Sequence, residues 1–139
     1  MFRISRFFDR KLEDNEAQAK AVKHIFQASS SPAPYIVFGP PGTGKTVTMV
    51  EAIKQVYRYK ENSKLLVCAP SNSASDLLAE RIVTHVEKRH VLRIHALSRS
   101  VRDLPETIKV NSAPRRFNCS CLFTIFLPPH CPTTPAVEH

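Results

Sequence analysis

Glycine is scarce in this sequence: only 3 of the 139 residues are glycine, and there is no tryptophan. The chain also lacks a run of about 18 apolar residues, the length that a membrane-spanning helix requires. Its first residues lack the long apolar stretch of a secretory signal. We therefore expect a soluble protein in the cytoplasm. A chain of 139 residues is long enough for one domain and too short for two.

Acidic residues are also few, with 12 Asp and Glu against 20 Lys and Arg, for a net charge of +8. This balance favours a polyanionic partner such as nucleic acid, and a solvated basic surface is the alternative. Among the four cysteines, Cys68 stands in an apolar run, so we expect it in the core. The other three lack the paired spacing of a structural zinc site, so we expect no metal centre of their own.

All three glycines lie in the stretch Gly39–Thr46. It follows Tyr35–Phe38, four apolar residues that predict a buried parallel strand, and it fits the phosphate-binding pattern G-x-x-x-x-G-K-[ST]. Backbone N–H groups that wrap a polyphosphate need conformations and close approaches that a Cβ would block. We therefore predict a P-loop that binds a nucleoside triphosphate, and a plain strand-to-helix turn is the alternative.

The chemistry of this loop assigns a role to its last residues. Lys45 supplies positive charge for the outer phosphates, and the Thr46 hydroxyl can ligate Mg²⁺. The helix that begins there directs its N-terminal partial positive charge at the same anion. The predicted ligand-binding residues are Gly39, Pro40, Pro41, Gly42, Thr43, Gly44, Lys45 and Thr46.

A helix over residues 16–29 is predicted upstream of the loop, because its apolar residues recur on one face. Asn15 is a good N-cap, and Gln18 stands at the N3 position of a capping box. The alternative role of Gln18 is an amide that hydrogen-bonds the edge of an adenine. Spacing alone does not decide between the two roles.

Downstream of the loop, residues 44–59 predict a second amphipathic helix, and Leu65–Ala69 predicts a second strand. We expect the polar residues of this predicted helix, Glu51, Lys54 and Arg58, to face water. Strand, helix and strand in this order predict a βαβ unit, which is parallel and right-handed.

The stretch Pro70–Asp76 then consists almost entirely of small or short polar residues. It lies at the carboxyl end of a predicted strand, where open α/β sheets bind ligands. The side chains of Ser71, Asn72 and Ser73, together with a helix N-terminus, suit contacts to a nucleic-acid backbone. Ser73-x-x-Asp76 also resembles a capping box, so a helix entry is the alternative, and both can hold.

The remaining segments are a helix over 74–89, a strand over 90–94 and a basic loop over 97–105. In that loop Arg99 and Arg102 can contact a phosphate or can simply be solvated. Residues 1–14 predict a linker without a fold of its own. Residues 110–139 contain five of the eleven prolines and no glycine, which predicts an irregular tail, although 121–127 can form a strand.

Together the motifs resemble a known family. GPPGTGKT at Gly39–Thr46, followed by APSNSASD at Ala69–Asp76, resembles superfamily 1 helicases of the nonsense-mediated-decay type. Within that group, the similarity is greatest to Armitage-type (Moloney leukaemia virus 10-like) RNA helicases, and it covers about residues 6–109. The stretches that carry it are Phe7–Asn15, Ala33–Val56 and Ala96–Lys109.

The resemblance implies an α/β fold, the first part of a RecA-like P-loop NTPase domain with a parallel sheet and flanking helices over residues 15–109. It implies ATP and Mg²⁺ as cofactors and single-stranded RNA as partner. Gln18 would read the adenine, Lys45 and Thr46 would act in catalysis, and Ser71 to Ser73 would contact RNA. Such helicases move along RNA, typically 5′ to 3′, in silencing and turnover granules, the P-bodies.

The sequence also departs from the family. A Walker B strand ends in Asp-Glu, which holds Mg²⁺ and positions water, but the only adjacent acidic pair here is Glu13-Asp14, before the P-loop. The arginine finger of a second domain has no place in this length. An AAA-type module would need its own Walker B and lid, and it does not explain Ala69–Asp76.

We therefore expect an ATP-binding fragment of an RNA helicase that is inactive alone. The alternative is a non-catalytic, nucleotide- or RNA-binding truncated product. We interpret residues 110–139 as an alternative exon, a frameshift or the end of a gene model. A three-stranded sheet would leave an edge open, so we also expect marginal stability or aggregation.

Overall fold

The computed structural model of the chain describes residue 4 and residues 6–60, 63–96, 99–109, 112–115 and 122–126. The helices are α1 (Arg10–Glu13), α2 (Glu16–Gln27), α3 (Lys45–Tyr59), α4 (Asn72–Ile82) and α5 (Glu106–Lys109). Two 3₁₀ turns lie at Lys88–His90 and Val101–Asp103. The strands are β1 (Leu65–Ala69), β2 (Val91–Ala96), β3 (Ser112–Arg115) and β4 (Leu122–Phe126). None of the described helices is long and apolar enough to cross a membrane.

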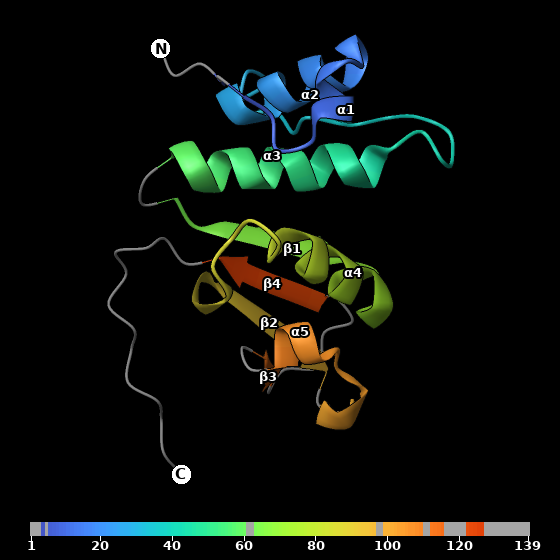
Figure 1. Cartoon of the computed structure of the whole chain (residues 1–139), viewed down its shortest axis with the longest axis vertical. Coiled ribbons are helices and arrows are strands. Elements are labelled where there is room, and N and C mark those ends of the chain that lie inside the picture. The colour runs from blue at the N-terminus through green and yellow to red at the C-terminus, as the bar shows by residue number, and fades with distance from the viewer. Residues whose placement is uncertain are drawn as a thin grey trace.

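Helix α3 forms the middle layer, with α1 and α2 on one side and the sheet with α4 on the other (Figure 1). Two apolar clusters hold the layers together. One contains Phe7, Leu12, Ala19, Val22 and Ala52, and the other contains Val50, Ile53, Ile82, Val86 and Val91. Both clusters include α3 residues, so α3 is covered on two faces.

This position explains a wrong prediction about α3. Glu51 and Lys54 do not face water: only 2% of Glu51 and 7% of Lys54 is exposed. A helix between two layers has no broad polar face, so its polar side chains must find partners inside. Arg58 is exposed, as predicted.

The partners of Glu51 lie in the segment that we predicted to be a linker. The Glu51 carboxylate accepts hydrogen bonds from the backbone N–H of Phe8 (2.9 Å) and of Asp9 (3.2 Å). Gln55 Nε2 donates to the carbonyl of Arg6 at 2.9 Å. Residues 6–13 therefore pack on α3 as part of the fold.

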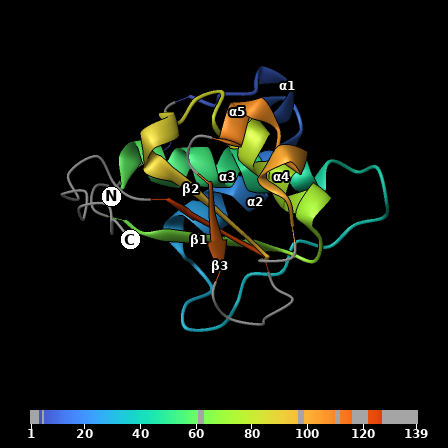
Figure 2. The ribbon, with the colours of Figure 1, turned by 90° about the horizontal axis from the view of Figure 1, so that it is seen from below.

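The sheet is mixed, in the order β1-β4-β2-β3. β4 runs antiparallel to both β1 and β2, and only β2 and β3 are parallel. The predicted parallel sheet is therefore wrong for most of its pairs. Because β4 lies between β1 and β2 in the sheet, these two strands do not pair with each other. Figure 2 shows the strands from below, on the side of α3 away from α1.

The predicted strand Tyr35–Phe38 does not form. The segment lies outside the described sheet, and 79% of Ile36 and 95% of Phe38 is exposed. A strand is stable only when its backbone groups pair, and the described sheet contains no pairing for this segment. Apolar residues alone therefore gave the wrong prediction here.

The predicted irregular tail contributes two strands to the sheet, β3 and β4, and the second confirms that residues 121–127 can form a strand. Pro114 lies in β3, which is the last strand in the sheet order and can lack a backbone donor. The other residues of 110–139, including the three cysteines there, lie outside the described residues.

The region around β1 and α4 departs in detail from the predictions. Cys68 is exposed rather than in the core, because the face of β1 that carries it is not covered. The predicted helix over 74–89 begins earlier, at Asn72, and ends at Ile82. Ile82 and Val86 are buried, whereas Leu77 is 44% exposed.

Candidate functional site

The P-loop requires its glycines for different reasons. Gly42 and Gly44 have φ of +81° and +83°, a region that other L-residues rarely adopt. A Cβ on Gly42 would meet nothing, whereas a Cβ on Gly44 would collide with Nε2 of Gln18. A Cβ on Gly39 would lie 2.7 Å from the Thr43 hydroxyl. Gly44 is therefore the most constrained, by conformation and by space.

Lys45 lies across this loop. Its ammonium donates to the carbonyl oxygens of Gly39 and Pro40, both at 2.6 Å. Thr43 Oγ1 donates to the same Pro40 carbonyl at 2.8 Å. A phosphate that enters the loop can replace these carbonyls as the acceptor for the Lys45 ammonium, because charged acceptors bind an ammonium more strongly.

Gln18 connects α2 to the P-loop. Its backbone N–H donates to Asn15 Oδ1 at 3.2 Å, which caps α2 as predicted. Its side chain does not complete a capping box but donates from Nε2 to the carbonyl of Thr43 at 2.9 Å. The structure therefore brings Gln18, Thr43 and Lys45 together at one place.

Two cavities adjoin the loop. The first, of about 430 Å³, lies between α2 and the loop, and its lining includes Asn15, Gln18, Tyr35, Gly39, Thr43 and Lys45. The second, of about 330 Å³, is lined by apolar residues of α3, β1 and α4 with Lys45, Thr46, Ala69, Pro70 and Ala74. Lys45 lines both cavities, and the residues present fit a phosphate group with its magnesium ion.

Ser71, the first of the predicted RNA-contacting residues, caps α4. Its Oγ accepts from the backbone N–H of Ala74 at 3.2 Å. The predicted capping box of Ser73 and Asp76 is therefore wrong, because the N-cap is Ser71 and α4 begins at Asn72, one residue before Ser73. Ser73 is exposed in the first turn of α4.

Asp76 is instead the centre of a buried ion cluster. Its Oδ1 accepts a hydrogen bond from Arg93 Nε at 2.9 Å and lies 2.9 Å from Arg93 Nη2 in an ion pair, and its Oδ2 accepts from Arg99 Nη2 at 2.6 Å. For Arg99 the sequence left phosphate contact and solvation open, and the structure shows neither, because Asp76 and the carbonyl of Asp103 occupy its Nη2. Arg102 is exposed, so both alternatives stay open for it.

The sequence predictions missed Arg93. It is fully buried, and its Nη2 donates to the carbonyl and to Oδ1 of Asn72 at 3.3 and 3.4 Å. Burial lowers the pKa of Arg93, and its hydrogen bond and ion pair with Asp76 oppose that shift. An arginine within the apolar run of β2 was the available signal, because a buried charge requires a partner.

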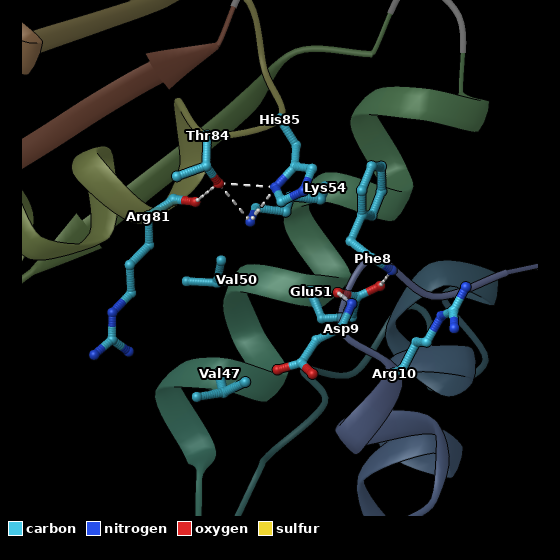
Figure 3. A pocket seen from close by; sticks show the side chains of 10 residues that line it. All are labelled: Phe8, Asp9, Arg10, Val47, Val50, Glu51, Lys54, Arg81, Thr84 and His85. Carbon is cyan, nitrogen blue, oxygen red and sulfur yellow. Dashed lines mark hydrogen bonds between the residues drawn. The ribbon is translucent and has the colours of Figure 1, made fainter.

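A further cavity of about 430 Å³ lies beside α3, and none of the predicted site residues line it (Figure 3). On its wall Lys54 Nζ lies 3.0 Å from Thr84 Oγ1 and 2.8 Å from His85 Nδ1. Burial lowers the pKa of both Lys54 and His85. These contacts join the end of α4 to α3. Within the described part of the chain, no group of His, Cys, Asp and Glu is placed to hold a metal ion.

The profile of the AAA domain family matches residues 13–121, which include the P-loop, Gln18 and the Arg93 cluster. The chain belongs to this family. The match continues beyond the point near Lys109 where we expected similarity to end. It implies a P-loop NTPase fold, which agrees with the α/β arrangement predicted.

The chain is also similar to individual known proteins. The chain is 55% identical over 104 residues to MOV-10 of Gallus gallus, covering 75% of this chain and 11% of the relative. It is 44% identical over 111 residues to RNA helicase Mov10l1 of Mus musculus, covering 77% and 9%. To the regulator of nonsense transcripts 1 homolog of Drosophila melanogaster it is 43% identical over 91 residues, covering 66% and 7%.

These relatives confirm the predicted resemblance to Moloney leukaemia virus 10-like helicases of the nonsense-mediated-decay group. The chain spans only 7–11% of the length of these three relatives, 11% in the case of the Gallus gallus protein. No solved structure matches it.

Proposed function

We propose that this chain binds ATP with Mg²⁺ through Gly39–Thr46. The convergence of Gln18 and Lys45 on the loop carries the proposal. Lys45 would hold the outer phosphates, Thr46 would hold the magnesium ion, and Gln18 would exchange its bond to Thr43 for the adenine. The ion, when bound, neutralises phosphate charge and orients the triphosphate.

We further propose that the chain is the ATP-binding part of an ATP-dependent RNA helicase. The relatives named as RNA helicases support this role, and so do the net charge of +8 and the exposed hydroxyls at the start of α4. Ser71, Asn72 and Ser73 would contact the backbone of single-stranded RNA. A location in the cytoplasm and in P-bodies is part of the same proposal, and imaging of the tagged chain tests it.

Binding of ATP without turnover is the second candidate. All residues that line the two cavities at the P-loop are neutral or basic, whereas hydrolysis needs a carboxylate that positions water and Mg²⁺. This candidate predicts that the chain binds nucleotide and releases no phosphate, with or without RNA.

Titration with a fluorescent ATP analogue in the presence of Mg²⁺ tests nucleotide binding. We expect Lys45→Ala to weaken the affinity by roughly 10- to 100-fold, because it removes a charged hydrogen bond to phosphate. Lys23→Ala, which changes an exposed lysine of α2, is the matched control and should bind as the unaltered chain does. Equal affinity of the two variants would contradict the assignment. Phosphate release measured with RNA present would contradict the binding-only candidate.

A further inference from the structure

We propose that Arg93 and Asp76 position the start of α4 for RNA, and that Arg93 turns the Asn72 amide so that its nitrogen can donate to a phosphate oxygen. This proposal rests on the proposed role of Ser71 to Ser73 in binding RNA. It adds Arg93 and Asp76 to that site as positioning residues, and it states how the Asn72 amide is oriented.

The first step of the argument is charge. A buried arginine is tolerated only when its donors are satisfied, and Arg93 has no exposed surface. Asp76 satisfies it through Oδ1 and is itself held on the other oxygen by Arg99. Two guanidinium groups therefore fix one carboxylate in the first turns of α4, so α4 cannot rotate without breaking both ion pairs.

The second step is the reach of Arg93 beyond Asp76. The same Nη2 that meets Asp76 also meets two acceptors of Asn72, its carbonyl and its side-chain oxygen. A guanidinium has only donors. The side chain of Asn72 must therefore present its oxygen to Arg93 and its NH₂ group to the opposite side.

The third step is what this orientation makes available. Within the described part of the chain, the Asn72 NH₂ group has no hydrogen-bond partner. Asn72 is partly exposed, and the neighbouring Ser71 and Ser73 are exposed. An amide NH₂ group next to two hydroxyls, at the N-terminus of an 11-residue helix, presents donors to an anion. The acceptor that fits is a backbone phosphate, which every RNA sequence supplies.

Three variants of the full chain separate the two parts of this proposal. Arg93→Lys cannot reach Asp76 and Asn72 together, because lysine lacks the planar fork of donors. Asn72→Asp keeps an oxygen toward Arg93 but loses the NH₂ group. Arg89→Lys changes an arginine whose side chain is 73% exposed on the surface, and it is the matched control.

The order at the start of α4 is measured by hydrogen exchange at two backbone amides, Ala74, which donates to Ser71 Oγ, and Ser75, which donates to the Ser71 carbonyl. RNA affinity is measured by the fluorescence anisotropy of a labelled polyuridine strand. Arg93→Lys should speed exchange at both amides and weaken polyuridine binding, each by roughly tenfold. Asn72→Asp should leave exchange slow and still weaken polyuridine by roughly tenfold. Arg89→Lys should change neither, and no variant should change the affinity for the ATP analogue.

Unchanged exchange in Arg93→Lys would overturn the positioning role, and unchanged polyuridine affinity in Asn72→Asp would overturn the orientation of the amide. If Arg93→Lys does not fold, the pair Asn72→Ala and Asn72→Asp replaces it. Faster exchange in the alanine variant alone supports the contact with Arg93, and equal exchange in both contradicts it. If the unaltered chain does not bind polyuridine, the proposed RNA function and the amide's role fail, while the exchange result still decides whether Arg93 orders the start of α4.

Discussion

The P-loop and the start of α4, the two segments with predicted ligand contacts, are held in opposite ways. The P-loop bonds mainly to itself: Lys45 donates to carbonyls of its own loop, and Gln18 is its one contact from α2 described above. The start of α4, from its N-cap Ser71 to Asp76, is held from outside, by Arg93 of β2 and by Arg99. A loop that must exchange its bonds for those of a ligand benefits from weak internal contacts. A segment that presents donors at one fixed place needs support from behind.

The largest effect should come from breaking the outside support. Asp76→Ala would leave two arginines without their carboxylate, one of them fully buried. We expect it to lower the free energy of unfolding by about 3–5 kcal/mol, measured by urea denaturation. Glu87→Ala removes the acid of the exposed Arg89 pair and should cost less than about 1 kcal/mol. Equal losses in both would contradict the importance of burial.

The support behind the P-loop helix should be the next largest. Glu51→Ala would leave the N–H groups of Phe8 and Asp9 without their acceptor. The expected loss is about 1–3 kcal/mol for each donor that water cannot reach. Glu51→Gln keeps an oxygen acceptor for one of the two donors and should lose roughly half as much. Urea midpoints of the two variants measure the difference, and identical midpoints would rule out a role for the second bond.

A smaller effect should distinguish two glycines of the P-loop. Gly44→Ala and Gly42→Ala both force an alanine into positive φ, which costs about 1–2 kcal/mol. Only the change at Gly44 also displaces Gln18. We therefore expect both variants to lose stability, and Gly44→Ala to lose more affinity for the ATP analogue. A greater loss of affinity in Gly42→Ala would show that the contact with Gln18 is unimportant.

The smallest expected effect on stability concerns the contacts of Lys54 in α3 with Thr84 and His85, which follow α4. Burial and the charge of Lys54 lower the pKa of His85 below its ordinary value of 6.5, while Glu51 opposes this. The unfolded chain then binds more protons, so stability should fall as pH decreases through 6.5. The window ends below the folded pKa, and the exposure of His85 makes the change small. Urea titrations with His85→Gln as control measure it: the variant should lose this part of the pH dependence.

Lys54 should also make stability increase with pH, but in a more alkaline pH range. Burial lowers its pKa below 10.5, so the stability contribution of Lys54 should rise with pH on the alkaline side, up to that value. Lys54→Met should remove this alkaline gain and also reduce the change near pH 6.5, because the charge of Lys54 contributes to the lowered pKa of His85. An unchanged alkaline profile in Lys54→Met would contradict the effect of burial on this lysine.

The comparison also shows what could be predicted from the sequence. The P-loop, its helix and the cap at Asn15 followed from local patterns, because glycine conformation, helix periodicity and capping are set within a few residues. The roles of Glu51 and Arg93 did not follow, because both depend on packing partners more than fifteen positions away. The strand at Tyr35–Phe38 was predicted wrongly for the same reason, since strand formation depends on a neighbour that local patterns do not specify.

The exposed Ile36 and Phe38 also bear on the expected aggregation. An extended apolar segment with unpaired backbone groups is a place where two copies can pair. Whether the isolated chain is marginally stable stays a prediction. Ile36→Lys would test this segment, because a charge at such a position opposes pairing between copies.

The bonds from Glu51 to Phe8 and Asp9, and from Gln55 to Arg6, have a mechanical consequence. Tension applied upstream of Arg6 would not extend a loose tether but would load α3 directly. The first residue of that helix is Lys45, so α3 would transmit the force directly to the P-loop. Force applied to the amino-terminal segment should therefore change the affinity for nucleotide, and bound nucleotide should change the resistance of that segment to force.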